Sequence, residues 1–337
     1  MNRPAPVSRI LGTGHYLPEK IVTNDELSTY VDTSDAWIQE RTGIRQRHVA
    51  EPAIATSDMA AEAAKRALEA AGVAASEIDL ILVATVTPDH QLPATAVFVQ
   101  QKIGAGPVPS LDLAAACAGF VYGLTIADQF IASGAAKRVL VIGVELLSRI
   151  LDWKDRTTCV LFGDGAGAVI LGPAEESTAA NGKRQGLLAT HIQSDATLAQ
   201  SLWIPAGGTR LPITAALIDE AENKVHMKGQ DIFKVAVKNL FSSSKKVLEK
   251  SGLGPDDIDW ICPHQANLRI IDSAVNMLGA DKEKVLVNID RVGNTSSASI
   301  PILLDESIRS GKVKSGDTVL MCALGAGISW GAAIVTI

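Results

Sequence analysis

The chain has 337 residues, of which 47% are hydrophobic but only 4% aromatic, and its formal net charge at pH 7 is −6. This length allows a large core in one or two domains, while the acidic balance argues against a nucleic-acid partner and no apolar run is long enough to span a membrane. The first residues lack the apolar segment of a signal peptide and the four cysteines lack metal-binding spacing, so we expect a cytoplasmic protein with reduced thiols and no metal.

The hydrophobic pattern predicts strands that alternate with helices, as in an α/β protein. Strands are expected near residues 80–86, 110–115, 138–144, 167–172, 258–262, 285–289, 318–323 and 332–337. Helices are expected near residues 24–30, 34–41, 57–71, 94–103, 118–132, 230–251, 267–278 and 298–310. The polar segment 173–229, rich in Gly, Ala and Thr, is expected to be an irregular connection that carries a functional loop.

A repeat at a spacing of 180 residues relates the two halves of the chain. KRALEAAGVAASEID at 65–79 and KKVLEKSGLGPDDID at 245–259 share six residues at the same offsets, and RVLVIG at 138–143 falls on TVLMCA at 318–323. Each member of the first pair reads as an amphipathic helix, a glycine stop and the approach to an apolar strand. The simplest explanation is a duplicated α/β unit with parallel strands.

Cys117 stands in LDLAAACAGFVYGL, at a predicted turn from a strand into a helix. The N–H groups of a helix N-terminus favour a thiolate, and the small neighbours leave room for a substrate, so Cys117 is a candidate nucleophile. The backbone N–H of Cys117 could also face a carbonyl oxygen. The alternative is a buried cysteine that packs a helix start.

Two further polar residues lie at predicted segment ends. His264 follows a strand in ICPHQANLRI, where ligands bind in parallel sheets, and the repeat places Ala84 at the equivalent position. Asn294 lies in the turn RVGNTSSASIP. A structural histidine and an ordinary turn asparagine are the alternatives. The glycine turns FGDGAGAVIL and CALGAGISWGAAIV do not form a dinucleotide fingerprint, and suit oxyanion donors or tight packing.

A third group combines an aromatic side chain with arginines. TSDAWIQERTGIRQRH at 33–48 carries Trp37 and Arg41, and DWKDRTT at 152–158 adds Arg156. Such a set suits an anionic nucleotide. The alternative is a surface helix whose tryptophan packs underneath.

Together, AAACAGF around Cys117, PHQANLRI after His264, GNTSSAS around Asn294 and WIQERTGIRQRH resemble the β-ketoacyl-acyl-carrier-protein synthase III family, the condensing enzymes that start bacterial fatty-acid chains. The resemblance runs nearly end to end and is weakest across 173–226. It implies the thiolase fold, an α/β fold with duplicated βαβαβαββ halves in five αβαβα layers. The halves would be residues 1–175, with the nucleophilic cysteine, and 176–337, with the histidine and asparagine. A homodimer is also implied.

The resemblance further implies a reaction that needs no cofactor or metal. The cysteine takes an acyl group from acyl-CoA, malonyl-acyl carrier protein loses CO2, and the resulting carbanion attacks the acyl-cysteine. Cys117, His264 and Asn294 are the implied catalytic residues, because a thiolate is both nucleophile and leaving group and two neutral donors can stabilise an enolate. A second oxyanion hole is implied at the backbone N–H groups of Cys117 and Ala326.

Binding residues are implied in the same way. The residues for CoA and its pantetheine arm are Trp37, Arg41, Arg156, Gly229, Phe233 and Asn267. Because acyl carrier proteins are acidic, docking is assigned to Lys234, Gln265 and Arg269, while Lys238 also fits an ordinary solvated lysine. The acyl pocket is assigned to Leu92 and Leu324, which stand where the family often has Phe. A smaller cap at Leu92 could admit longer or branched primers.

Several alternatives share the fold. A thiolase would need a second cysteine near a C-terminal glycine turn, which Cys322 could supply, although GNTSSAS and PHQAN fit the decarboxylating type better. Elongating condensing enzymes use two histidines, and plant-type polyketide synthases have longer chains. A condensing enzyme of secondary metabolism would use another starter or acceptor. A scaffold without activity is expected to lack one of Cys117, His264 and Asn294.

Overall fold

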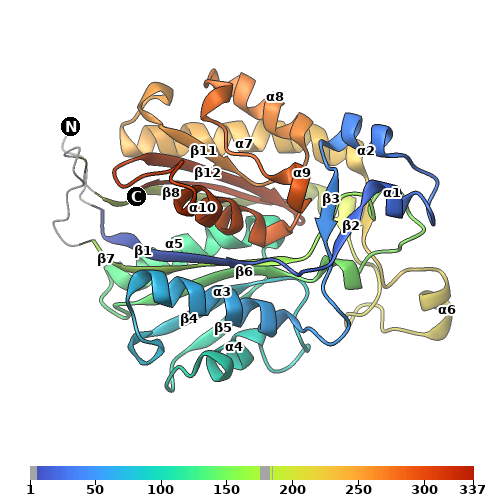
Figure 1. Ribbon diagram of the computed structural model, residues 1–337, viewed down its shortest axis with the longest axis horizontal. Helices are drawn as coiled ribbons and strands as arrows, with labels where there is room; N and C mark the ends of the chain where they lie inside the picture. The colour runs from blue at the N-terminus through green and yellow to red at the C-terminus, as the bar shows by residue number, and fades with distance from the viewer. Residues whose placement is uncertain (1–5, 175–182, 184) are drawn as a thin grey trace.

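The computed structural model describes residues 6–174, 183 and 185–337 (Figure 1). Two β-sheets alternate with helices in five layers, and their strand orders are β1-β7-β6-β4-β5 and β11-β12-β13-β8. The strands of the first sheet are β1 (Ser8–Tyr16), β4 (Leu80–Ala84), β5 (Ser110–Leu113), β6 (Val139–Glu145) and β7 (Gly165–Pro173). Those of the second are β8 (Gly186–Ser194), β11 (Trp260–Pro263), β12 (Thr318–Gly325) and β13 (Ser329–Thr336). Short strands pair as β2 (Ile21–Thr23) with β3 (Gln46–His48) and β9 (Leu202–Trp203) with β10 (His226–Met227).

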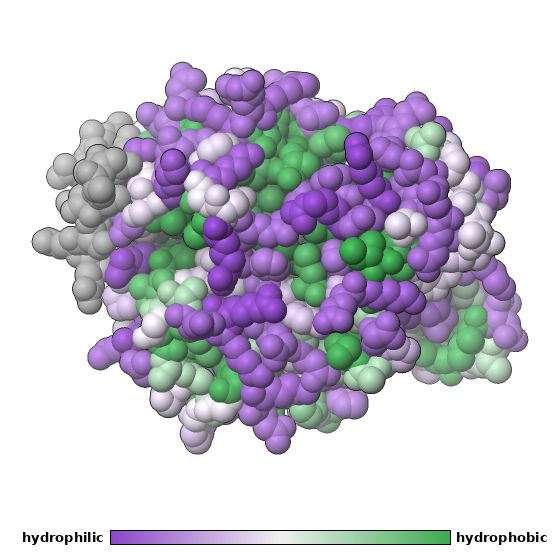
Figure 2. All heavy atoms as spheres, in the orientation of Figure 1, coloured by the Kyte–Doolittle hydropathy of each residue, from purple (hydrophilic) through white to green (hydrophobic). Residues whose placement is uncertain are grey.

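Six helices of the described residues form the three helical layers. The helices are α1 (Asn24–Leu27), α2 (Asp35–Thr42), α3 (Thr56–Ala71), α4 (Thr95–Ile103), α5 (Gly119–Ala132), α6 (Ala215–Asp219), α7 (Gly229–Ser251), α8 (Leu268–Leu278), α9 (Ile289–Val292) and α10 (Ser299–Arg309). Helices α3 and α4 cover the outer face of the first sheet and α7 and α8 that of the second, while α5 and α10 lie between the sheets. Figure 2 shows a mainly hydrophilic outer face with small separate hydrophobic groups, because the apolar residues fill the layers inside.

The central strands are apolar on both faces, which explains their continuous hydrophobic runs. In β4, Leu80 and Leu82 point to the middle helical layer, whereas Ile81 and Val83 point to α3 and α4. In β12 the same alternation directs Met321 to the middle layer, and directs Cys322 and Leu324 to the outer layer of α7 and α8. The duplication therefore produces two sheets that share one helical layer.

The spacing of 180 residues is visible in the structure. The short 3₁₀ turns Ala75–Glu77 and Pro255–Asp257 are related by it, and so are the left-handed glycines that end α3 and α7, Gly72 with φ 63° and Gly252 with φ 65°. Each half follows the order βαβαβαββ, except that the third strand of the second half is reduced to one bridge between Val285 and Ile261. The repeat predicted from the sequence is therefore confirmed.

The same spacing relates two tight turns that meet between the sheets. Ala116–Ala118 leads into α5 and Ser296–Ala298 leads into α10, each as a single 3₁₀ turn, and the two turns contact each other. Their first residues have the same unusual backbone, with φ 46° at Ala116 and 50° at Ser296. We call these turns the first and the second elbow.

Two predictions about elements are wrong. Residues 285–289 do not form a strand, because the Gln265 side chain takes over their backbone groups: Oε1 accepts from Asn288 N at 3.1 Å and Ile289 N at 3.2 Å, and α9 follows. The segment 173–229 is not irregular throughout, because β8 lies within it and pairs with β13. The edge strand β1 was also not predicted from the sequence.

No helix in the described part of the chain is long and apolar enough to cross a membrane. Among the same residues, no group of three or more His, Cys, Asp or Glu side chains is placed to hold a metal ion.

Candidate active site

Cys117 lies in the first elbow, between β5 and α5, and is almost completely buried. Burial raises the pKa of its thiol to about 12, a hydrogen bond with the Ser296 side chain lowers it, and the negative charge of Glu145 raises it. The placement at a helix start agrees with the prediction from the sequence. Burial of the thiol acts against the effect expected of a helix N-terminus, because desolvation disfavours the thiolate.

Gly325 allows β12 to approach the nucleophile. A Cβ atom at Gly325 would lie 2.4 Å from the backbone nitrogen of Cys117 and 3.0 Å from Cβ of Ala116, so only glycine fits there. Ala326 follows in the turn between β12 and β13 and is half-buried, just outside the residues that line the cavity.

His264 directly follows β11, and its backbone N–H donates to the carbonyl oxygen of Cys322 at 2.8 Å. Its Nδ1 lies 2.6 Å from Oγ of Ser299, which also accepts from the backbone N–H of Gln265 at 3.2 Å. When Ser299 donates to Nδ1, a neutral ring carries its proton on Nε2. Burial lowers the pKa of His264 to about 3, so the ring is neutral at physiological pH.

Asn294 is fixed by the backbone on both sides. Its N–H donates to Leu161 and its carbonyl oxygen accepts from Gly163, both at 2.9 Å. The side-chain Oδ1 accepts from the backbone N–H of Ser296 at 2.9 Å, which leaves the Nδ2 amino group to serve as a donor. Asn294 is therefore arranged to donate a hydrogen bond, as His264 is.

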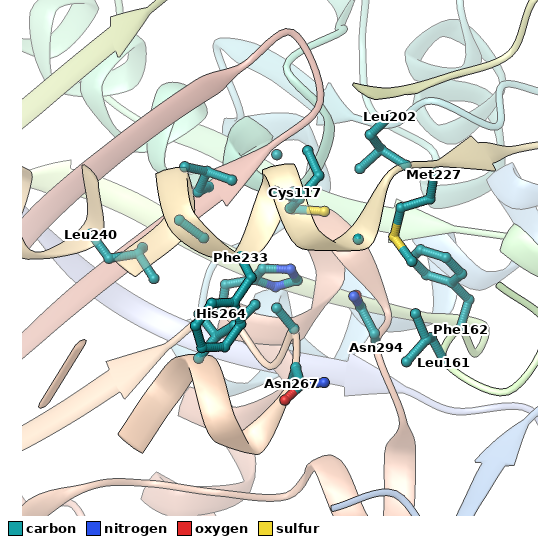
Figure 3. A pocket seen from close by; sticks show the side chains of 17 residues that line it. Cys117, Leu161, Phe162, Leu202, Met227, Phe233, Leu240, His264, Asn267 and Asn294 are labelled. Atoms are coloured by element: carbon teal, nitrogen blue, oxygen red, sulfur yellow. The ribbon is translucent and has the colours of Figure 1, made fainter. Parts of the chain in front are cut away.

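One cavity of about 140 Å³ brings these three side chains together (Figure 3). Cys117, His264 and Asn294 line it, and so do four of the other residues predicted from the sequence: Gly229, Phe233, Asn267 and Leu324. Leu161, Phe162, Leu202, Met227 and Leu240 are among the apolar residues that complete the walls. The cavity thus joins a thiol, an imidazole and two primary amides inside a mainly apolar lining.

Trp37, Arg41 and Arg156 form a separate cluster. The guanidinium carbons of Arg41 and Arg156 lie 4.9 and 5.3 Å from the centre of the Trp37 ring. Asn267 links this cluster to the cavity, because its Nδ2 donates to the carbonyl oxygen of Arg41 at 3.0 Å. Its Oδ1 accepts from the N–H of Arg269 at 2.9 Å and so caps α8. The C-terminal end of α2, which carries Arg41, is therefore tied to a residue that lines the cavity.

The remaining predicted positions lie elsewhere. Leu92 is 86% exposed and outside the cavity lining. Lys234, Lys238 and Arg269 are exposed on α7 and α8. Gln265 is completely buried. Its side-chain Nε2 donates to the carbonyl oxygen of Pro263, and its Oε1 accepts from the backbone N–H groups of Asn288 and Ile289. Its predicted place on a docking surface is therefore contradicted, because a sequence motif does not show which side of a turn faces inward.

Cys322 does not support the thiolase alternative. It belongs to the apolar cluster under α7 and α8 and lines a different small cavity from that of Cys117. A second cysteine acting on the same substrate would have to share the cavity of Cys117, and Cys322 does not.

Three residues of the site were not predicted. Ser299 orients His264, Ser296 contacts both Cys117 and Asn294, and Glu145 lies behind them with no exposed surface. The two serines stand in or next to the turn GNTSSAS, where serine is a common residue type and so gives no distinct signal. The signal for Glu145 was a lone carboxylate in the apolar run RVLVIGVELL.

Comparison with known proteins identifies the class and then the family. The model of 3-oxoacyl-[acyl-carrier-protein] synthase III matches residues 111–196, and the model of its C-terminal part matches residues 248–337. The chain is 49% identical over 326 residues to β-ketoacyl-[acyl-carrier-protein] synthase III of Caldanaerobacter subterraneus subsp. tengcongensis, covering 97% of this chain and 96% of the relative. For the synthase of Xanthomonas oryzae pv. oryzae, identity is 51% over 331 residues and coverage is 97% and 98%.

A solved structure agrees. The crystal structure of 3-oxoacyl-[acyl-carrier-protein] synthase III from Aquifex aeolicus VF5 superimposes with a TM-score of 0.88 and 45% identity, covering 98% of this chain and all of that one. The fold is thus that of the thiolase-like condensing enzymes. The chain belongs to the β-ketoacyl-[acyl-carrier-protein] synthase III family.

Proposed function

We propose that the chain condenses an acyl-CoA primer with malonyl-acyl carrier protein, giving 3-ketoacyl-acyl carrier protein, CoA and CO2, and so starts fatty-acid synthesis. The observation that carries this proposal is the single cavity lined by Cys117, His264 and Asn294. These side chains come from three separate segments, and each has its polar atoms oriented by a neighbouring residue. Membership of the family supports the same reaction.

In the first half of the reaction, the Cys117 sulfur attacks the thioester carbonyl carbon and CoA leaves. The charge on the carbonyl oxygen needs two donors, for which we assign the N–H groups of Cys117 and Ala326. The close approach of Gly325 to Cys117 N supports this, because it brings the β12–β13 turn to the nucleophile. No metal ion enters this scheme.

In the second half, malonyl-acyl carrier protein loses CO2 and builds enolate charge on its thioester oxygen. Nε2–H of His264 and Nδ2–H of Asn294 are the assigned donors. The low pKa of His264 supports this role, because a neutral imidazole donates through Nε2 but is a poor base. The enolate carbon then attacks the acyl-cysteine, and the thiolate of Cys117 leaves.

The CoA nucleotide is assigned to the Trp37 cluster. An adenine between the faces of Trp37 and Arg156 would replace their direct contact with two stacking contacts, and a phosphate would lie near Arg41, which also contacts Trp37. The pantetheine arm would then pass Asn267, Gly229 and Phe233 to reach Cys117, since these residues line the cavity.

Exposed residues support the assignment of two protein partners, acyl carrier protein and a second copy of the chain. Lys234 and Arg269 extend into solvent from the helices whose first turns line the cavity, which suits docking of an acidic carrier protein. A homodimer is supported by the exposed Leu92 and by Leu111, which is 38% exposed on the edge strand β5. In such a dimer Leu92 would cap the acyl pocket of the partner. We assign the protein to the cytoplasm, where these substrates occur.

Intact-protein mass spectrometry tests the proposal. Wild type and Cys117→Ala are mixed with acetyl-, isobutyryl- and octanoyl-CoA, and malonyl-acyl carrier protein is then added. We expect an acyl adduct on wild type only, and its conversion to 3-ketoacyl-acyl carrier protein. No adduct from any acyl-CoA would contradict the proposal. A change in chain-length preference in Leu92→Phe would support the role of Leu92 as a cap, and an unchanged preference would contradict it.

A further inference from the structure

Glu145 is a buried carboxylate at the C-terminal end of β6, directly behind the two elbows. Its Oε2 accepts hydrogen bonds from Val86 N at 3.0 Å and Thr87 Oγ1 at 2.9 Å. Its Oε1 accepts from Oγ of Ser296 and from Oγ of Ser297, both at 3.1 Å. The side chain has no exposed surface and is not in the set assigned above to substrate.

No cation balances this carboxylate. Among the described residues, no Lys, Arg or His forms an ion pair with Glu145. Cys117 is the one titratable residue on the segments packed against it, residues 84–87, 116–118 and 296–298. Asp164, which directly precedes the neighbouring strand β7, is turned away toward Ser148 and Ala50. A buried charge without a partner is costly, so its presence beside the nucleophile calls for a function.

The network can hold Glu145 in both protonation states. Ser297 has one hydroxyl proton but two acceptor neighbours, the carbonyl oxygen of Ala84 at 2.8 Å and Oε1 of Glu145 at 3.1 Å. When this proton points to Ala84, the Ser297 oxygen faces Oε1 and can accept a proton from a neutral carboxyl group. Burial raises the pKa of Glu145 to about 7, so both states are accessible near neutral pH.

Ser296 connects Glu145 to the nucleophile. Its hydroxyl group donates to Oε1 of Glu145 at 3.1 Å, its elbow contacts the elbow of Cys117, and a hydrogen bond from its side chain lowers the pKa of the Cys117 thiol. All three residues are buried, with exposed fractions of 7% for Cys117, 3% for Ser296 and 0% for Glu145. Ser296 is therefore the buried polar group that links the thiol to the carboxylate.

The reaction requires an acceptor for the thiol proton, and His264 is poorly suited to that task because its pKa is about 3. We propose that Glu145 accepts the proton of Cys117 through Ser296 during acylation and returns it when the cysteine is released. This inference rests on the proposed function for its substrates, but the transfer itself needs only these three residues.

The S–H bond of Cys117 breaks as its proton passes to Oγ of Ser296, and the original Ser296 proton passes to Oε1 of Glu145. The sulfur forms a bond to the thioester carbon, the carbon–sulfur bond to CoA breaks, and the CoA thiolate takes a proton from solvent. After condensation the bond between Cys117 and the acyl carbon breaks. Glu145 then returns a proton to Ser296, and Ser296 returns one to the sulfur.

The two elbow serines provide a matched pair of variants. Ser296→Ala and Ser297→Ala each remove one 3.1 Å hydrogen bond to the same carboxylate oxygen, but only Ser296 also contacts Cys117. Glu145→Gln keeps the shape and removes the basic oxygen. The first measurement is the rate of Cys117 alkylation by iodoacetamide between pH 5 and 10, which requires no CoA substrate. The second is single-turnover acylation by acyl-CoA.

We expect the wild-type alkylation rate to rise with pH near 7, as Glu145 becomes ionised. In Glu145→Gln and Ser296→Ala the rise should move toward the range of the isolated thiol, with rates at pH 7 reduced at least about tenfold. Ser297→Ala changes the hydrogen bonding of Glu145 but keeps Ser296 next to Cys117, so it should slow alkylation less than Ser296→Ala does. A purely electrostatic role predicts the opposite sign, because loss of the negative charge would lower the pKa of Cys117 and speed alkylation of Glu145→Gln.

Faster alkylation of Glu145→Gln, or equal slowing in the two serine variants, would overturn the proposal. Thermal unfolding of each variant shows whether it is folded, and Glu145→Asp, which restores a carboxylate, should recover part of the rate. If wild type shows the expected alkylation profile but no acyl-CoA labels it, the function proposed above fails while this inference stands.

Discussion

The hydroxyl group of Ser299 lies 2.6 Å from Nδ1 of His264, and both residues are buried. Ser299 is the first residue of α10, so the orientation of the imidazole is set by the start of a helix in the middle layer. The histidine was recognisable from its motif, whereas the group that fixes its tautomer is 35 residues away in the sequence.

Ser299→Ala tests this relationship. Without the serine hydroxyl group, the ring can rotate or place its proton on Nδ1, so the donor to the enolate is lost. We expect decarboxylation of malonyl-acyl carrier protein to fall by about 10- to 100-fold, while acylation of Cys117 by acyl-CoA stays near the wild-type rate. CO2 release and adduct formation are measured separately. An equal loss in both half-reactions would contradict this assignment.

The neutral state of His264 predicts a pH dependence. A pKa lowered to about 3 means that the ring becomes protonated only in strong acid. The decarboxylation rate should therefore show no step near pH 6.5, the usual range of histidine. The measurement is CO2 release from malonyl-acyl carrier protein between pH 5.5 and 8. A fall in rate below pH 6.5 in wild type that is absent in His264→Gln would show that the ring does titrate there.

Gly325→Ala tests the contact between β12 and the nucleophile. The added Cβ atom would lie 2.4 Å from Cys117 N, so one of the two segments must shift. We expect a loss of about 1–3 kcal/mol in the free energy of unfolding and slower acylation of Cys117. Gly106→Ala is the control, because a Cβ atom there meets nothing within 4 Å. Similar unfolding midpoints for the two variants would contradict the expected clash.

Arg156→Ala tests the assigned nucleotide site. Arg156 contacts the Trp37 ring and donates to the carbonyl oxygen of Asp32 at 2.9 Å. Removing it should raise KM for acyl-CoA several-fold and leave kcat nearly unchanged, because the arginine is far from the bonds that change. Lys137→Ala, another exposed cation, serves as the control for the loss of charge. An unchanged KM in Arg156→Ala would remove this residue from the CoA site.

Asp305→Asn tests a charged contact between the two halves. Asp305 of α10 is buried, which opposes its ionisation, but hydrogen bonds from His15, Thr13 and Arg309 outweigh burial and lower its pKa. A lowered pKa contributes stability above the usual aspartate range, and that contribution is lost as pH falls through the folded-state pKa. We expect Asp305→Asn to cost about 2–4 kcal/mol at pH 7 and less below pH 4, by urea unfolding. Asp272→Asn, an exposed position, is the control. A pH-independent difference from wild type would contradict the prediction.

Local patterns explain which parts of the fold were predictable. Buried strands such as β4 and β6 are apolar runs, and the helices α3 and α7 have periodic faces with glycine ends, so their positions follow from the sequence. The strand expected at 285–289 has the same apolar signal. It fails because the side chain of Gln265 competes for its backbone, and such a contact between distant segments leaves no local pattern.

In the site, too, residues in local motifs were predictable, whereas properties set by contacts between distant segments were not. Cys117, His264 and Asn294 stand in motifs of small and turn-forming residues, so they were visible as candidates. Their protonation states were not, because the pKa of Cys117 depends on how completely the two sheets exclude water. The sequence did not single out Glu145, and the prediction for Gln265 was wrong, because polar side chains are normally exposed and only the packed structure shows that these two are buried.

The two elbows give the molecule an internal near-symmetry that its chemistry does not follow. The spacing of 180 residues pairs Cys117 with Ser297, and pairs Gly325, which leaves space beside Cys117, with Glu145, which fills the space beside Ser297. The duplicated architecture therefore contains two equivalent positions. Cys117 occupies the first, which lines the cavity, and Ser297 occupies the second, where the carboxyl group of Glu145 fills the adjacent space. Each chain should accordingly load one acyl group at saturation, so the stoichiometry of labelling counts folded chains directly.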